Sequence, residues 1–428
     1  MNREFVYWNY PKLRRENNPG LGVDSAQDVV FCPVDIDTLC YILMRGGTYL
    51  ILFGGVWSHA TQSVIDKIND AARKHGVDTV YLFDFSADGT DRANIRQDIR
   101  AHENYIGEDK TEANPFAVYN YIYGEIATRH LTNLNDWVEE KIGSGKDITY
   151  LNLYQDAVTV PDLTEPFLFL YNRDNTLDHS GAGRQGERCP IVWAAELGEA
   201  DEDTGTLLEE KIFRHINENE CVLTPYGYAD YMREAFARNQ RGHGFKTEDA
   251  FRADEQIQLC KVPYQVFRWI LQQEGTFVML LAGPWCANSQ AAAATINDYA
   301  VANNNRVYMA DTRLDGKQPF DFWQYPRLNE LTLSCPAMRK YYLELWEQYL
   351  PGAQIPCTIN HALPYERNLT IEETDENGVE HRALRVGIPF LFAYDKDHFG
   401  NYNRRLPLLA SRPECKLELI NDSEKYIY

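Results

Sequence analysis

The stretch that decides the fold is FCPVDIDTLCYILMRGGTYLILFGGVWSHATQSVIDKIND, residues 31–70. Moved along the chain by 228 positions, it aligns without a gap with LCKVPYQVFRWILQQEGTFVMLLAGPWCANSQAAAATIND, residues 259–298, and 13 of the 40 positions are identical. The identical positions include a cysteine, two glycines, a tryptophan, a glutamine and the triplet IND. So long an alignment within one chain indicates an internal repeat.

Two further matches follow in the same order. VYLFDFSADG at 80–89 aligns with VYMADTRLDG at 307–316, and EPFLFLYNRD at 165–174 aligns with IPFLFAYDKD at 388–397. Chance similarity does not recur three times in order, so the sequence indicates duplication of one domain.

Both copies predict the same elements. IDTLCYILMRG and YQVFRWILQQEG have apolar residues at helical spacing and a closing glycine. TYLILF and TFVMLL are short apolar runs typical of a buried strand, and a small-residue turn, a second helix and a second strand follow. This order predicts a right-handed β-α-β crossover with a parallel strand pair. The later runs PFLFLY and PFLFAY begin with proline and predict an antiparallel hairpin strand.

We therefore predict an α/β protein with two similar domains, each with a central mixed sheet flanked by helices. The first domain is expected at residues 1–200 and the second at 259–428, joined by a helical linker at 201–258. In each domain a long aromatic-rich segment separates the second strand from the proline-led strand. These segments predict helical insertions at about 95–150 and 317–375.

Composition excludes several classes of partner. The 428 residues carry a formal net charge of −21, so nucleic acid and anionic membranes would be repelled. No apolar run approaches the ~20 residues of a membrane-spanning helix, and the N-terminus has no apolar signal segment. The nine scattered cysteines show no CxxC pair, which predicts a cytoplasmic protein with reduced thiols. The ten histidines show no grouping at metal-ligand spacing, so neither a metal nor a cofactor is expected.

The motif GPWCANS at 283–289 follows a buried strand and, with the β-α-β unit and GIPFLFAYDKDHFG at 387–400, resembles the thioredoxin-like superfamily. The resemblance implies that Cys286, preceded by Trp285, is the nucleophilic position. It also implies that Pro389 is the cis-proline opposite this cysteine. In the first copy it places Trp57 and Ser58 at the turn and Pro166 at the cis-proline position.

The sequence departs from the family pattern at two kinds of position in the repeated core. The second cysteine is replaced by Ser289 in the second copy and by Thr61 in the first. The buried acid five residues before the tryptophan is Leu280 and Leu52, respectively. A lone nucleophile stops at the mixed disulfide and needs an outside thiol, such as glutathione, to resolve it. The pattern in the second copy therefore indicates monothiol chemistry.

Cys286 has two interpretations. At the first turn of a helix the macrodipole favours a thiolate, and Ser289 is placed to donate a hydrogen bond to the sulfur. The alternative is a small residue kept at a helix N-cap after redox function was lost. Ser58 is interpreted as a plain N-cap and Glu165 as a solvated surface residue. Cys32 and Cys260 are equivalent in the repeat and are expected to pack in the core.

Two functions stay open on the sequence alone. The first is a monothiol thiol-disulfide oxidoreductase or isomerase that uses Cys286 on protein or peptide thiols, with glutathione as a candidate resolving thiol. The second is a non-catalytic module that binds an extended protein or peptide segment beside Pro166 and Pro389. The two copies are expected to form an intrachain pseudo-dimer through helices that bear Cys32 and Cys260.

Overall fold

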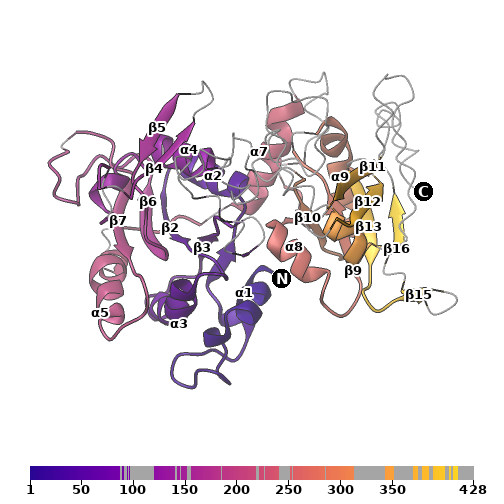
Figure 1. Ribbon diagram of the computed structural model, residues 1–428, viewed down its shortest axis with the longest axis horizontal. Helices are drawn as coiled ribbons and strands as arrows, with labels where there is room; N and C mark the ends of the chain where they lie inside the picture. Colours follow the sequence, from indigo (N-terminus) through magenta and orange to yellow (C-terminus); the bar gives the residue numbers. More distant parts are fainter. Residues whose placement is uncertain are drawn as a thin grey trace. The chain divides into compact units, whose positions relative to one another are not determined.

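The structure is a computed structural model, and the chain divides into two compact units, Met1–Tyr226 and Gly227–Tyr428 (Figure 1). The residues that it describes are 1–86, 89–90, 94, 96, 120–139, 142–144, 146–151, 156–184, 186–217, 221–225, 227–240, 251–252, 254–284, 286–312, 343–350, 370–374, 378–384, 389–400, 404–405 and 408–412.

The first unit is built on a five-stranded mixed sheet in the order β1-β3-β2-β6-β7. The strands β1, β3 and β2 run parallel, whereas β6 is antiparallel to β2 and β7 is antiparallel to β6. Their bounds are β1 Phe31–Pro33, β2 Thr48–Phe53, β3 Val80–Phe83, β6 Phe167–Asn172 and β7 Ile191–Glu196. All residues of β2 and β3 are buried, which confirms that these apolar runs are interior strands.

Helices cover this sheet on both sides, with α3 and α5 on one side and α2 and α4 on the other (Figure 1). The α-helices are α1 Asn2–Asn9, α2 Ile36–Met44, α3 His59–Lys74, α4 Tyr121–Arg129, α5 Thr204–Leu208 and α6 Arg214–Asn217. A π-helical turn at Glu209–Phe213 and 3-10 turns at Pro11–Leu13, Ala26–Asp28 and Leu134–Asp136 complete the unit. The α/β class with a central mixed sheet is therefore confirmed.

The second unit repeats the topology of the first. Its five-stranded sheet has the order β8-β10-β9-β13-β16, with three parallel strands followed by two antiparallel ones. The strands are β8 Leu259–Lys261, β9 Phe277–Leu281, β10 Val307–Ala310, β13 Phe390–Tyr394 and β16 Leu408–Arg412. The helices are α7 Tyr228–Gln240, α8 Tyr264–Ile270, α9 Ala287–Ala302 and a π-helical turn at Leu345–Tyr349, and a small hairpin joins β14 Phe399–Gly400 to β15 Arg404–Arg405.

Strand register agrees between the units at the positions that the sequence repeat aligns. Leu52 of β2 pairs with Leu168, and the aligned Leu280 of β9 pairs with Leu391. The residues that close α3 and α9 also agree: Gly76 has φ +67° and the aligned Asn304 has φ +51°. Asparagine is the residue other than glycine that visits this left-handed region most readily, so both helices end in the same way.

The insertions contain strands that the sequence analysis did not predict. In the described part of 95–150 the helix α4 is present as expected, but β4 Ile148–Leu151 pairs with β5 Ala157–Val160 in an antiparallel hairpin. In the second unit β11 Thr370–Thr374 pairs with β12 Glu380–Leu384. The described parts of the insertions also hold the 3-10 turn Leu134–Asp136 and the π-helical turn Leu345–Tyr349, and the other residues at 97–119, 317–342 and 351–369 lie outside the described residues. Strands of four or five residues are too short for their alternation to stand out from a helical pattern.

The segment 201–258 does not form a separate linker, because the boundary between the units falls inside it. Helix α5 packs against α3 of the first unit, whereas α7 packs against α9 of the second. Each helix buries an apolar face, Leu208 in α5 and Met232 in α7 among them, and such a face needs a core to cover. Cys32 and Cys260 also differ from expectation, since both lie in strands, β1 and β8, and are only partly buried.

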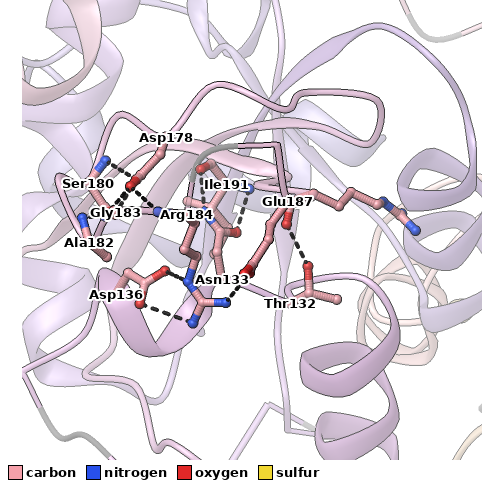
Figure 2. A network of polar contacts seen from close by, with 11 residues as sticks. Thr132, Asn133, Asp136, Asp178, Ser180, Ala182, Gly183, Arg184, Glu187 and Ile191 are labelled. Carbon is pink, nitrogen blue, oxygen red and sulfur yellow. Dashed lines mark hydrogen bonds and ion pairs between the residues drawn. The ribbon is translucent and has the colours of Figure 1, made fainter.

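The loop between β6 and β7 is held by a network of polar contacts (Figure 2). The Asp178 carboxylate accepts hydrogen bonds from the Ser180 hydroxyl at 2.6 Å and from the backbone N–H groups of Gly183 at 2.7 Å and Arg184 at 2.9 Å. The Arg184 guanidinium forms an ion pair with Asp136 at 2.5 Å and thereby ties the loop to the 3-10 turn. These bonds, that from Ser180 foremost, lower the pKa of Asp178 from 3.8 to about 2.

We expect this loop to be most ordered above about pH 4. Because the pKa of Asp178 is lowered in the folded protein, its stabilising contribution is complete above the unfolded value. That contribution is lost as the pH falls through about 2. Asp178→Asn should therefore speed proteolytic cleavage within residues 173–190 at pH 6. At pH 2 the wild-type and Asp178→Asn proteins should show similar hydrogen-exchange rates in this loop. Equal cleavage rates at pH 6 would contradict the assigned role.

Candidate functional site

In the first unit the turn after β2 carries Trp57 and Ser58 into α3. The Ser58 N–H donates to Gly55 O at 3.1 Å, and the Ser58 hydroxyl accepts from the Thr61 N–H at 3.2 Å. Ser58 is buried and serves as the N-cap of α3, as interpreted from the sequence. Thr61 is fully buried against Gly54, where an added Cβ would lie 2.8 Å from its Oγ1.

Removing this cap tests its structural role. Ser58→Ala leaves the Thr61 N–H without its side-chain acceptor, so the free energy of unfolding of the first unit should fall by about 1 kcal/mol. Ser58→Asp keeps an acceptor at the cap and should cost less. Chemical denaturation of the three proteins gives the comparison, and an alanine variant as stable as the wild type would show that the Ser58 cap does not stabilise α3.

An aspartate that the sequence analysis missed lies against the same turn. The Trp57 indole N–H donates to Asp84 Oδ1 at 2.8 Å, and the Ser86 N–H donates to the same oxygen at 2.7 Å. A Cβ added at Gly55 would stand 2.5 Å from both Asp84 carboxylate oxygens, so only glycine fits there. The available signal was the repeat itself, because Asp84 aligns with Asp311 directly after the second strand of each copy.

Pro166 immediately precedes β6 and lies beside this turn, since Phe53 at the end of β2 pairs with Phe167. The Glu165–Pro166 peptide bond is cis, as expected. The expected surface position of Glu165 is wrong: its side chain is 3% exposed and lies 3.6 Å from the guanidinium of Arg96. Arg96 is itself 10% exposed and forms a second ion pair with Asp162 at 3.2 Å. The arginine compensates the charge of the buried Glu165 carboxylate.

In the second unit Cys286 occupies the position of Ser58. It is the N-cap residue of α9, its N–H donates to Gly283 O at 3.0 Å, and it is partly exposed and in no disulfide. Ser289 is buried under the turn, and its Oγ accepts from the Gly283 N–H at 3.4 Å. Whether Ser289 also donates to the sulfur stays a prediction.

Pro389 is buried next to Phe390, which pairs with Leu281 at the end of β9. The antiparallel register therefore brings Pro389 opposite Ala282, four residues before Cys286. Trp285 and Ile388 lie outside the described residues, and with them the expected tryptophan contact and the isomer of the bond before Pro389. The structure thus places Cys286, Ser289 and Pro389 around one turn, and Trp57, Ser58, Thr61 and Pro166 around the equivalent one.

An asparagine and a glutamine that the two units share at aligned positions have structural roles. Asn69 Oδ1 accepts from the Val30 N–H at 3.0 Å, and the aligned Asn297 accepts from the Gln258 N–H at 2.7 Å. Gln62 donates to Val56 O across the turn at 2.8 Å, and Gln290 donates to Pro284 O at the aligned position. These side chains hold the chain just before the first strand and the turn before the helix in both units. These hydrogen bonds account for the presence of the same residue at both aligned positions without a catalytic role.

Among the described residues no three His, Cys, Asp or Glu side chains gather into a group that would hold a metal ion. Within the same part of the chain, no helix has the length and apolar character needed to cross a membrane.

No family model matches the chain, and no curated protein is similar to it at a significant level. Among solved structures it is similar to a chain of the crystal structure of ERdj5 form II, with 11% sequence identity and a TM-score of 0.15. The match covers 72% of this chain and 24% of that one, so this chain spans 24% of the length of that relative. A likeness at this TM-score carries no argument about function.

Proposed function

We propose that the two units are copies of one thioredoxin-like domain and that the second copy is a monothiol thiol-disulfide enzyme with Cys286 as its nucleophile. Support for duplication comes from the common strand order, the common register at aligned residues and the equivalent asparagine and glutamine hydrogen bonds. Support for the family comes from the sequence motif, the mixed sheet and the proline-led strand beside the turn.

The main observation in support of the proposed thiol activity is the position of Cys286. Its sulfur lies at the N-terminus of α9, a helix of 16 residues, and its side chain is partly exposed. The unsatisfied N–H groups and the dipole of such a helix end stabilise a thiolate. Pro389 leads the strand next to this turn, so an extended substrate backbone has a neighbouring strand end to align with.

The proposed reaction begins when the Cys286 thiolate attacks one sulfur of a substrate protein or peptide disulfide. A new S–S bond joins Cys286 to that sulfur, and the other substrate sulfur leaves as a thiolate. Ser289 stands where a second cysteine would attack, so an external thiol such as glutathione must resolve the mixed disulfide. The thiolate of the external thiol attacks the substrate sulfur, forms a new disulfide with it and releases Cys286 as a thiolate. A reducing cytoplasm, which the sequence favours, supplies this thiol.

Alkylation tests the proposal. Iodoacetamide should modify Cys286 in the folded protein with a midpoint below the ~8.5 of an ordinary thiol. Peptide mass mapping should show Cys189 unmodified, because it is buried and burial raises its thiol pKa. Incubation with glutathione disulfide should add one glutathione to the wild-type protein and none at this position in Cys286→Ser. Modification of Cys286 only after unfolding would contradict the proposal.

A second candidate, for the first unit, is peptide binding without chemistry. Ser58 carries no sulfur at the position of Cys286, and its hydroxyl accepts the bond that caps α3. The proline-led strand and the turn remain beside each other as in the second unit. This function would be supported if Cys286→Ser bound a protein substrate without a covalent bond and if the further change Trp57→Ala abolished that binding. Trapping that survives Trp57→Ala would place binding elsewhere.

A further inference from the structure

Asp311 lies directly after β10, the strand beside the one that leads into the Cys286 turn. The Ala282 N–H, just beyond β9, donates to Ala310 O at 3.1 Å, and the turn continues until the Cys286 N–H bonds to Gly283 O. Asp311 is buried, being 6% exposed. A carboxylate is thus held in the interior at the sheet end from which Cys286 emerges.

The first unit shows where a carboxylate at this position points. Asp84 aligns with Asp311, and both its oxygens lie 2.5 Å from the Cβ position of Gly55, the residue whose carbonyl accepts from Ser58. Strand register is the same in the two units, since Tyr81 pairs with Ile51 and the aligned Tyr308 pairs with Met279. From this alignment and register we expect the Asp311 carboxylate beneath Gly283, whose carbonyl accepts from the Cys286 N–H.

The described residues place other polar groups on this side of the sheet. Strand β8 contributes Lys261, which pairs with Met309 and therefore shares the face of Asp311 two residues on. Lys261 is buried, and its ammonium donates to the Tyr231 hydroxyl of α7 at 2.8 Å. In the described part of β9, Leu280 pairs with Met309 and so lies on this face, and α9 contributes the Ser289 hydroxyl.

We infer that Asp311 sets the ionisation of Cys286, with its negative charge opposing the thiolate that the α9 N-terminus favours and Lys261 moderating that opposition. The inference rests on the proposed thiol activity. It gives the enzyme a carboxylate near its sulfur although the family's own position for one holds Leu280. An attacking thiol is most effective when it ionises near the ambient pH, so opposing influences of helix and carboxylate suit disulfide exchange at neutrality.

The test is the pH dependence of Cys286 alkylation, read by mass mapping. Asp311→Asn should lower the midpoint by about one pH unit, because removal of a nearby like charge favours the thiolate. Asp311→Glu should keep it near the wild-type value. The matched control is Asp298→Asn, which removes an exposed carboxylate from α9 itself and should leave the midpoint unchanged.

An unchanged midpoint in Asp311→Asn overturns the inference, while folded-state labelling of Cys286 in the same experiment leaves the proposed function standing. Absence of Cys286 labelling in every folded variant overturns the proposed function instead. Lys261→Met covers the case in which Asp311→Asn does not fold, as judged by circular dichroism. It removes the moderating positive charge and should raise the midpoint, and a midpoint that stays or falls contradicts the inference.

Discussion

Replacing Arg96 with alanine is expected to lower the free energy of unfolding of the first unit by about 3–5 kcal/mol, the cost of breaking a buried ion pair from one side. Arg96 lies 3.6 Å from Glu165 and 3.2 Å from Asp162, and the Glu165 side chain is 3% exposed. Without the guanidinium the Glu165 carboxylate stays in the interior uncompensated by its arginine. Chemical denaturation measures the loss.

Two comparisons make this result specific. Arg15→Ala removes an ion pair with Asp24 whose partners are 55% and 73% exposed, and it should cost less than about 1 kcal/mol. Arg96→Met combined with Glu165→Gln removes both charges and keeps most of the volume, so it should recover much of the loss. If Arg96→Ala lowered the free energy of unfolding no more than Arg15→Ala, the Arg96–Glu165 pair would not stabilise the segment that leads into β6.

The second large effect is expected at the repeated asparagines. Asn69→Ala removes the acceptor of the Val30 N–H in the first unit, and Asn297→Ala removes the acceptor of the Gln258 N–H in the second. Both asparagines are fully buried. Because a buried N–H is left without its partner, each substitution should destabilise its own unit by about 2–4 kcal/mol.

Hydrogen exchange locates these two effects. Asn69→Ala should speed exchange in β1 and leave β8 unaffected, and Asn297→Ala should do the reverse. Asn303→Ala is the matched control. That exposed amide follows α9 and donates to a carbonyl of the last helical turn, Tyr299 O, so its removal should change stability by less than about 0.5 kcal/mol. If either substitution alone speeded exchange in both units, the Asn69 and Asn297 hydrogen bonds would not act separately, each in its own unit.

The repeat and the apolar patterns were sufficient to predict most of the core. Helix α3 was recognisable from its apolar spacing and the glycine that ends it, and β2 from an uninterrupted apolar run. These signals are local, because burial of one helix face or of a whole strand must be written in consecutive residues. The hairpins β4–β5 and β11–β12 escaped prediction, since short strands that mix polar and apolar residues carry no such signal.

The candidate site was predicted only where a motif or the repeat marked it. Cys286, Ser58 and the two prolines stood out by alignment, and the structure brings Pro166 and Pro389 to the expected turns. Asp84 was missed although its alignment with Asp311 was visible, because an aspartate after a strand is common in solvated loops. Only the distance from Trp57 separates the two cases.

By itself, the sequence determined the α/β class of this protein and showed that just one of two aligned turns carries a cysteine, because both facts reside in residue order. Only the tertiary structure decided that Glu165 is an interior charge clamped by Arg96, that the segment 201–258 divides between the two units, and that an aspartate lies under the turn. Burial and charge compensation depend on contacts between residues that are far apart in the sequence, and a single sequence does not show those contacts.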